Sequence, residues 1–405
     1  MISMPYFAMI CSMKILIVCQ FYYPENFVIY KIAEQLVKDG HTVDVLTGKP
    51  NYGYGYILPE YKNISEEVIN GVNVHRVDIS PRKQSRFSII NNYLSFWTKS
   101  KQWVKKTKNK YDIVYSMSLS PVTICSAGNL YKKKHNVPHV IHCVDLWPES
   151  VLVTKAVRKN SLTYKILYKW SRDIYKHADK ILVGSPSFKE YFEKVLKLST
   201  DNISYVPQCS LVENTDSPAF EYGKGTHILY CGNLGLIQLI PLMCEAMKLV
   251  NQENKDIYLH VIGMGPMTDY LKNFISTSGL EKHIIYHGPM TAANAASFFK
   301  GSDALYVSLK DEGYIGKTIP NKLMMSMAFE KPIIAVLSGD GRQVLQESNG
   351  ALFAEEDPES IKNAIIALAN MSKKEKDHLG HNNKEYYESH FSLRSVVNEI
   401  EKHLK

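Results

Sequence analysis

Apolar runs and helical stretches alternate along the first half of the chain. An apolar run at 14–21 precedes the segment 27–41, in which apolar residues recur at helical spacing, and a second apolar run follows at 42–48. A strand, a helix and a strand joined by short connections are typical of a parallel α/β sheet. The same pattern predicts further strands, with helices between them, over residues 111–117, 138–145 and 180–185.

A second series of the same kind starts near residue 227. It predicts strands at 227–233, 257–265, 283–288, 304–309 and 332–336, and helices at 241–252, 292–300 and 320–329. Both halves are therefore expected to be doubly wound. The stretch 207–226 is rich in Pro, Gly, Ser and Asn and has no apolar period, which is typical of a linker.

The length of 405 residues also favours two domains. We expect an N-terminal domain over 13–206 and a C-terminal domain over 227–384, with a tail at 385–405 that packs back on the first domain. Hydrophobic residues make up 45% of the chain and charged residues 22%, a composition that excludes a disordered or fibrous protein.

Cysteines and the N-terminus indicate a reduced, non-exported protein. The seven cysteines include no CxxC pair and no Cys/His cluster at zinc-ligand spacing, so we expect core thiols in a cytosolic protein. Residues 1–11 lack the basic region of a signal peptide, and no run approaches 18 apolar residues. We interpret residues 1–12 as an extension before a second start at Met13; a short membrane foot is the alternative.

Positive charge is concentrated in the first half. Residues 1–200 carry 29 Lys and Arg against 15 Asp and Glu, whereas residues 201–405 carry 19 against 25. The segment 81–110 has nine basic residues and no acidic one. Such a field suits an anionic lipid surface, nucleic acid or a phosphorylated substrate. No nucleic-acid-binding module is recognisable, so we do not expect nucleic acid as a partner.

The basic segment also carries aromatic and aliphatic residues at helical spacing. Residues 87–110 contain six lysines and no acid, among the apolar positions Phe87, Ile90, Leu94, Trp97 and Val104. With Lys101 and Lys105, this pattern predicts a helix that faces an anionic membrane interface. The alternative is a core helix with a solvated basic face.

Candidate ligand contacts lie just after the predicted strands, because open α/β sheets bind ligands at the carboxyl ends of their strands. Two aromatic and Pro/Gly-rich loops, 20–26 and 47–55, follow the first two strands. We expect them to contact a sugar or a lipid head group through Pro24, Glu25, Asn51 and Tyr52. Packed turns without a ligand are the alternative.

A carboxylate ends another strand of the first half. Asp145 stands beside Trp147, and His142 lies three residues before it. We expect Asp145 to orient or deprotonate an acceptor group against the aromatic wall of Trp147. Strand alternation puts His142 on the opposite face from Asp145, and we interpret it as a satisfied core histidine.

Glycine turns follow two strands of the second half. Gly232 and Gly235 leave room for backbone N–H groups to approach a diphosphate at a helix N-terminus, although a simple tight turn is the alternative. The turn at 263–266 is similar, and we interpret it as structural.

The run 308–332 is the most informative in the chain. Thr318 is placed to cap a helix whose first turn holds Pro320, Asn321 and Lys322. A helix N-terminus that carries a lysine attracts a diphosphate through its dipole, its free N–H groups and the ammonium. Lys310 and Lys317 in the preceding loop either add charge or are solvated.

Five motifs now stand in order along the chain: MKILIVCQFYYPE, TGKPNYGYG, DLWPES, GNLGxxQ and IPNKxxxxMAxxKPI. Together they resemble the retaining glycosyltransferase family 4, in particular bacterial O-antigen and capsule enzymes that include fucosamine transferases. The resemblance implies the GT-B fold, in which two doubly wound Rossmann-like domains face each other across a cleft. It also implies a donor site in the second domain and an acceptor site in the first.

The resemblance assigns roles by position. Lys322 would pair with the donor diphosphate and act in catalysis with Asp145 on the acceptor side. The other donor contacts would come from Gly232, Asn233, Gly235, Gln238, Lys310, Lys317, Pro320 and Asn321. It implies retention at the anomeric carbon without a metal or another cofactor, since the helix dipole and basic side chains stabilise the leaving diphosphate.

The chain departs from the family at the ribose. Many members carry two glutamates eight positions apart, and those positions fall on Lys317 and Met325 here. A thioether is a much weaker acceptor for ribose hydroxyls than a carboxylate. Glu330 stands at the far end of the helix, where glycine is usual in the family. Many relatives also carry an Arg and a Lys in the first glycine loop, and this chain has Asn233 and Gln238 near those positions.

The resemblance implies transfer of a sugar to an undecaprenyl-diphosphate-linked saccharide in capsule or O-antigen synthesis. The donor it implies is a UDP-linked sugar, for example an N-acetylated amino sugar such as N-acetylfucosamine. The enzyme would lie peripherally on the cytoplasmic face of the inner membrane. A GT-B nucleotide-sugar epimerase and a non-catalytic subunit of a polysaccharide assembly complex are the alternatives. The sequence leaves the oligomeric state, the donor sugar and the linkage open.

Overall fold

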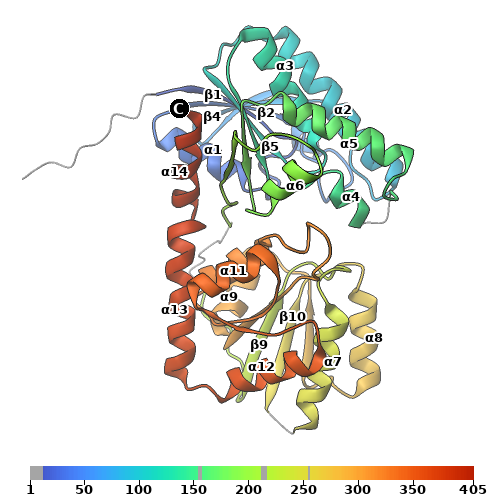
Figure 1. Ribbon diagram of the computed structural model, residues 1–405, viewed down its shortest axis with the longest axis vertical. Coiled ribbons are helices and arrows are strands. Elements are labelled where there is room, and N and C mark those ends of the chain that lie inside the picture. The colour runs from blue at the N-terminus through green and yellow to red at the C-terminus, as the bar shows by residue number, and fades with distance from the viewer. Residues whose placement is uncertain (1–11, 154–156, 211–216, 254–255) are drawn as a thin grey trace, which may run out of the picture. The chain divides into compact units, whose positions relative to one another are not determined.

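The computed structural model describes residues 12–153, 157–210, 217–253 and 256–405, so the expected N-terminal extension lies almost wholly outside the described residues. The chain divides into two compact units. The first comprises Met1–Gln208 and Val396–Lys405, and the second comprises Cys209–Ser395. Each is a sheet with helices on both faces (Figure 1), so the predicted α/β class is confirmed.

The sheet of the first unit has eight strands in the order β3-β4-β2-β1-β5-β6-β7-β8. The strands are β1 Lys14–Val18, β2 Thr42–Gly48, β3 Glu66–Ile69, β4 Val72–Val77, β5 Ile113–Ser118, β6 His139–Cys143, β7 Lys180–Val183 and β8 Ile203–Tyr205. β1 pairs in parallel with β2 and β5, and burial on both faces explains its unbroken apolar sequence.

The antiparallel edge of this sheet was not predicted. β3 pairs with β4 through the turn Asn70-Gly71, where both residues have positive φ. An Asn-Gly pair between two short apolar runs is a hairpin signal, so the sequence did contain the information.

Helices cover both faces of the first sheet. They are α1 Ile29–Lys38, α2 Arg86–Lys106, α3 Ser126–His135, α4 Glu149–Val153, α5 Leu162–Lys176, α6 Phe188–Lys194 and α14 Leu393–Leu404, with short 3-10 turns η1 Pro59–Tyr61 and η2 Val122–Cys125. α2 and α3 pack on one face through Phe96 and Tyr131, against Leu16 and Val18 of β1, and α1 lies on the other (Figure 1).

The sheet of the second unit has six parallel strands in the order β11-β10-β9-β12-β13-β14. The strands are β9 Thr226–Cys231, β10 Ile257–Ile262, β11 Ile284–Gly288, β12 Ala304–Ser308, β13 Ile333–Val336 and β14 Ala351–Phe353. The helices are α7 Ile240–Gln252, α8 Thr268–Ser278, α9 Ala292–Gly301, α10 Asn321–Ala328, α11 Gly339–Ser348, α12 Pro358–Asn370 and α13 Lys373–His390.

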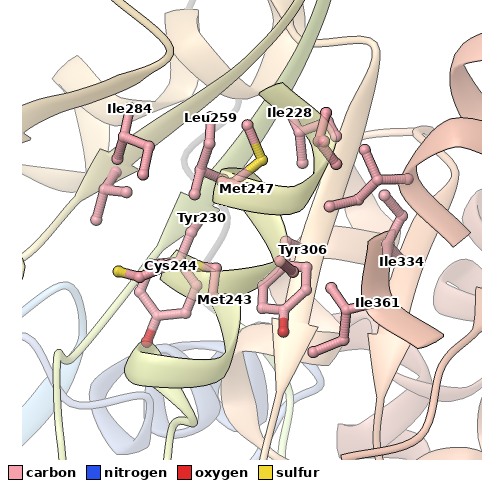
Figure 2. Packing of buried hydrophobic residues seen from close by; sticks show 14 of the residues in the cluster. Ile228, Tyr230, Met243, Cys244, Met247, Leu259, Ile284, Tyr306, Ile334 and Ile361 are labelled. Carbon is pink, nitrogen blue, oxygen red and sulfur yellow. The ribbon is translucent and has the colours of Figure 1, made fainter. Parts of the chain in front are cut away.

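Strand alternation divides the core of the second unit into two layers. Ile228 and Tyr230 of β9 point toward Met243 of α7 and Ile361 of α12 (Figure 2). Leu229, between them, packs on the opposite face with α9, α10 and α11. The apolar faces predicted for these strands and helices are thus both used.

Two predicted boundaries differ from the structure. In the expected linker, Phe220 stacks on Phe298 at 4.2 Å between ring centroids, so this part belongs to the second unit. In the expected tail, Tyr387 and Phe391 belong to the core of the second unit, and only Val396–Lys405 joins the first. Residues 396–405 join the first unit because they belong to the amphipathic helix α14, which buries Val396, Val397 and Ile400.

Candidate functional site

Three segments of the second unit meet where β9 ends. Gly232 has a φ of +150°, and a Cβ at Gly263 would collide with the carbonyl oxygen of Gly232. A Cβ at Gly232 would lie 3.7 Å from Cε of Lys322, the second residue of α10. Only glycine permits this approach of the two turns, so the structural role predicted for 263–266 holds, and the predicted diphosphate turn lies beside Lys322.

Lys322 is a partly buried cation without an acidic partner. Its Nζ donates a hydrogen bond of 2.9 Å to the hydroxyl of Tyr230 and lies 4.4 Å from the centre of that ring. No carboxylate among the described residues forms an ion pair with it. Burial lowers the pKa of Lys322 from 10.5 to about 7. An anion bound here would compensate the buried charge.

The N-terminus of α10 adds to this attraction. Pro320 is the N-cap residue and makes no side-chain capping bond, and Asn321 is exposed. The first N–H groups of a helix have no partners within the helix, and its dipole is positive at that end. Thr318 does not cap the helix as predicted, because its hydroxyl instead donates to the carbonyl of Ile315 at 2.9 Å.

Two amide side chains surround the turn after β9. A Cβ at Gly235 would lie 2.7 Å from Nδ2 of Asn233 and would collide with Oε1 of Gln238. Oε1 of Gln238 is buried and has no hydrogen-bond partner among the described residues. Tyr230 donates a bond of 2.6 Å to the carbonyl of Asn233 and so connects Lys322 to this turn.

The two loop lysines contribute less. Nζ of Lys310 lies 2.8 Å from Oε2 of Glu312, so its charge is already paired. Lys317 is exposed, and its carbonyl accepts a bond from Asp340 N–H at 2.8 Å. The sequence left two roles open for these residues, added charge for a ligand or a solvated side chain. The structure favours a solvated side chain for both lysines.

No carboxylate replaces the missing ribose ligand on α10. Met325 is partly buried and packs against the hydrophobic cluster that contains Leu323 and Met327. Glu330 lies beyond the opposite end of α10 and accepts a bond from His381 at 3.3 Å. The departure from the family pattern at Met325 therefore persists in the structure.

In the first unit, Asp145 ends up in a small polar cluster beyond β6. Its Oδ2 accepts a bond from the hydroxyl of Ser120, and Ser120 lies 2.6 Å from the hydroxyl of Ser150. Burial raises the pKa of Asp145 above its ordinary value. A carboxyl with a raised pKa at a strand terminus is suited to proton transfer.

The neighbours of Asp145 differ from the prediction in one case. His142 is a core histidine as predicted, bonded to the hydroxyl of Tyr115 at 2.7 Å and to the carbonyl of Val206 at 2.9 Å. Trp147 is only 5% exposed, so the expectation that it forms an aromatic wall for the acceptor is wrong. The fold uses it in the core, and its carbonyl accepts a short bond from Ser171, at 2.5 Å.

Glu25 and Asn51 hold a loop in place. The buried carboxylate of Glu25 accepts bonds from the N–H groups of Asn51, at 2.6 Å, and Tyr52, at 2.5 Å. Oδ1 of Asn51 accepts a bond of 2.8 Å from Arg82 N–H. Both side chains are thus engaged inside the protein instead of facing an acceptor, and Pro24 beside them is partly buried.

The loop that Glu25 positions presents tyrosines to solvent. Tyr52, Tyr54 and Tyr56 are 43%, 48% and 54% exposed, and Tyr54 and Tyr56 lie 6.2 Å apart. Of the tyrosines in this loop, a ligand contact was predicted from the sequence only for Tyr52. The alternation of tyrosine with glycine was the signal that could have identified Tyr54 and Tyr56.

α2 has a buried face and an exposed apolar face. Phe87, Ile90 and Leu94 are 81%, 57% and 41% exposed, in line with partly exposed Trp97. The opposite face buries Asn92, Phe96, Ser100 and Val104, so Val104, the last apolar position at helical spacing, belongs to the core face. Nζ of Lys101 lies 4.7 Å from the centre of the Trp97 ring, and Lys105 is exposed.

Three further observations concern metal ligands, thiols and membrane-spanning helices. Within the described ranges, no group of three His, Cys, Asp or Glu side chains is placed to hold a metal ion. The six cysteines there are free thiols, five of them buried, whereas Cys11 lies outside. Across the same residues, no helix combines the length and the apolar character needed to cross a bilayer.

Family models match both units. A glycosyl transferase 4-like domain matches residues 26–209, and a domain of the glycosyl transferases group 1 matches residues 225–371. A probable glycosyltransferase of Pseudomonas aeruginosa, WbjE, is 25% identical over 48% of this chain and 49% of its own length. The match thus spans about half of that relative. An uncharacterized glycosyltransferase of Methanocaldococcus jannaschii, MJ1178, is 25% identical over 68% of this chain and 70% of its own.

Solved structures share the fold at low identity. Sucrose-phosphate synthase from Thermosynechococcus elongatus has a TM-score of 0.69 at 14% identity, covering 96% of this chain and 98% of its own. Anabaena HepE in complex with UDP and glucose has a TM-score of 0.66 at 12% identity, covering 97% and 99%. WaaG, a glycosyltransferase involved in lipopolysaccharide biosynthesis, has a TM-score of 0.66 at 10% identity, covering 96% of this chain and 99% of its own. Family models match consecutive parts of the chain, and these solved structures have the GT-B fold. The chain therefore belongs to the glycosyltransferases of family 4 type.

Proposed function

We propose that this protein transfers a sugar from a UDP-linked donor to a lipid-linked saccharide, with retention at the anomeric carbon. The observation that carries the proposal is Lys322, a partly buried cation beside Gly232 at the N-terminus of α10. HepE, which shares the fold, is solved in complex with UDP and glucose, which supports the nucleotide.

The proposed chemistry needs charge stabilisation on the donor side. When the bond between the anomeric carbon and the diphosphate oxygen breaks, negative charge develops on the leaving nucleotide. The Lys322 ammonium and the free N–H groups at the start of α10 would stabilise it, with Asn233 and Gln238 beside them. These groups can serve without a metal or another cofactor, which is part of the proposal.

The acceptor side rests on the first unit. The exposed rings of Tyr52, Tyr54 and Tyr56 offer flat apolar faces on which a sugar ring can stack. Asp145 would accept the proton of the attacking hydroxyl. The exposed apolar face of α2 supports an acceptor held in a membrane, as in capsule or O-antigen synthesis, where an N-acetylated amino sugar such as N-acetylfucosamine would be transferred.

Isothermal titration with UDP, GDP and their sugars tests the donor site. We expect one nucleotide to bind wild-type protein, with a loss of affinity of about tenfold or more in Lys322→Ala, because bonds to charged groups contribute strongly. Lys310→Ala removes an exposed lysine paired with Glu312 and should leave affinity nearly unchanged. Folded wild-type protein that binds none of these compounds would overturn the proposal.

A second candidate function is a non-catalytic subunit of a polysaccharide assembly complex. The thioether of Met325 at the usual ribose ligand favours it. The two candidates are separated by the same titration, because a non-catalytic subunit need not bind a nucleotide sugar. A soluble epimerase is disfavoured by the exposed apolar face of α2.

A further inference from the structure

A basic groove lies on the first unit, and its lining includes neither Asp145 nor any residue of the tyrosine loop. It has a volume of about 770 Å³ and is lined by residues of α2, α3 and α5, by Thr123 of η2, and by Asn136 and His177, which follow α3 and α5. Two tryptophans line it, Trp97 from α2 and Trp170 from α5, with ring centroids 5.9 Å apart and an interplanar angle of 25°. Neither α5 nor α3 carries a residue that the proposed transfer uses.

The charge of the groove is positive and largely uncompensated. Four lysines line it, Lys101, Lys132, Lys133 and Lys176, against one carboxylate, Asp173. Lys132 is engaged, because its Nζ lies 2.6 Å from Asp179. The other three lysines form no ion pair with any residue that the structure describes, so their charges remain available to a ligand.

Asp173 does not neutralise these lysines. Its carboxylate lies 3.8 Å from Nδ1 of His177, and its carbonyl lies 2.6 Å from the same nitrogen. The carboxylate is therefore turned toward its own helix neighbour. The net field of the groove attracts a compact anion such as a phosphate.

Two exposed apolar stripes lead into the groove. On α5, Leu162, Ile166 and Trp170 follow one another at four-residue intervals and are 76%, 45% and 39% exposed. On α2, the exposed face described above ends at Trp97. The stripes thus meet at the stacked tryptophans. Tryptophan is enriched where one end of a side chain is in lipid and the other in water.

We propose that this groove binds the phosphate head group of an anionic membrane phospholipid, while the stripes on α2 and α5 enter the lipid interface. The proposal rests on the membrane role of the proposed function and names the lipid that the surface selects. A plainer explanation of Lys133 and Lys176 is that they stabilise the C-terminal ends of α3 and α5 through the helix dipoles. That explanation accounts for neither the stacked tryptophans nor the exposed stripes.

Vesicle co-sedimentation of the full chain tests the proposal. The probes are vesicles of phosphatidylcholine alone and of an equimolar mixture of phosphatidylcholine and phosphatidylglycerol. We expect wild-type protein to prefer the anionic vesicles. Lys133→Ala/Lys176→Ala should lower partition to them by about thirtyfold, as expected for two lysines near an anionic surface, and should leave binding to neutral vesicles unchanged.

A matched control has the same change in net charge. Lys38 and Lys189 are exposed on α1 and α6, outside the groove, and Lys38→Ala/Lys189→Ala should change partition by about twofold or less, because distant charges are screened. Equal losses in both double variants would overturn the proposal, as would a wild-type chain that does not distinguish the two kinds of vesicle.

A second pair of changes tests the stripe separately. Leu162 and Ile166 are exposed, so Leu162→Ser/Ile166→Ser should not unfold the protein but should weaken binding to both kinds of vesicle. Unchanged vesicle binding in this variant would contradict the role of α5. Nucleotide titration of the groove variants should match wild type. Vesicle results that follow the proposal without any nucleotide binding would refute the transferase and leave the groove intact.

Discussion

At the scale of single residues, Lys322 shows how burial prepares a side chain for a ligand. Its ammonium lies against the Tyr230 ring instead of a carboxylate. The sequence placed this lysine at a helix N-terminus, but its neighbours come from β9, about ninety residues earlier in the chain. The low pKa is therefore a property of the packing and not of the motif.

The first prediction concerns protons. The pKa of Lys322 in the free protein is about 7, and a bound diphosphate would raise it. Binding then takes up a proton, so affinity for the nucleotide should fall by as much as about tenfold per pH unit as pH rises above 7. Titrations between pH 7 and 9, in buffers with different ionisation enthalpies, measure both quantities.

The control for this prediction is Lys322→Arg, which keeps the charge at every pH tested because arginine does not deprotonate in this range. Its nucleotide affinity should not vary between pH 7 and 9. A wild-type affinity that is equally flat would show that Lys322 does not meet the phosphate.

The second prediction concerns Met325. If ribose lies beside it, Met325→Glu should raise nucleotide affinity by about tenfold, since a carboxylate accepts hydroxyl hydrogen bonds. Met325→Gln is the control of matched size and should give a smaller gain. Titration of both variants decides the point; a Glu variant that binds no better than wild type places the ribose elsewhere.

At the scale of elements, a strained residue follows the C-terminal end of α10. Glu330 has a φ of +58°, a conformation that non-glycine residues adopt at a cost, and among the described residues its carboxylate forms an ion pair only with the exposed His381. Glycine is the residue best suited to the left-handed conformation that ends many helices.

The third prediction follows from this strain. Glu330→Gly should raise the free energy of unfolding by about 1 kcal/mol, because relief of the left-handed strain exceeds the loss of the exposed pair. Glu330→Ala removes the carboxylate but keeps a Cβ and should show no such gain. Urea denaturation of both variants provides the comparison; a stabilised Ala variant would attribute the effect to charge.

α2 illustrates how an element can be predicted while its surroundings are not. The periodicity of 87–110 predicted the helix, yet left both a membrane face and a core face open. The structure shows that α2 has both faces, because Phe96 and Val104 pack against the sheet while Phe87 projects into solvent.

At the scale of the whole molecule, the second unit is crossed by a chain of three histidines. His227, His260 and His287 come from β9, β10 and β11, and consecutive rings are bonded at 3.0 Å. Nε2 of His227 donates to the carbonyl of Gly223, Nε2 of His260 donates to Nδ1 of His227, and Nε2 of His287 donates to Nδ1 of His260. In this arrangement His260 donates through one ring nitrogen and accepts through the other, which only its neutral form can do.

The fourth prediction is acid sensitivity of the second unit. Burial, then the neighbouring His287 and His227, lower the pKa of His260 from 6.5 to about 3. The unfolded chain takes up this proton near pH 6.5 and the folded unit does not. The stability is therefore complete above pH 6.5 and is lost as pH falls toward 3, by about 1.4 kcal/mol per pH unit for one proton.

His260→Gln tests the acid prediction, because glutamine hydrogen-bonds without titrating. The difference in urea stability between wild type and this variant should change between pH 7 and 5 in the direction that disfavours wild type. A difference that does not depend on pH would exclude His260 as the group responsible.

The sequence by itself determined the elements and their order. β2 covers the predicted residues 42–48, and the loops after β1, β6 and β9 carry the candidate residues, because local spacing sets strands and helices and parallel strands end at one edge. The Lys322 motif was equally local.

Only the tertiary structure decided what each polar or aromatic side chain faces. It turned Glu25 into a support for the tyrosine loop, buried Trp147, and brought Trp170 against Trp97. These outcomes depend on contacts between segments far apart in the chain. The spacing of residues along one segment carries no information about which distant segment will cover it, so burial, pairing and exposure were set by packing alone.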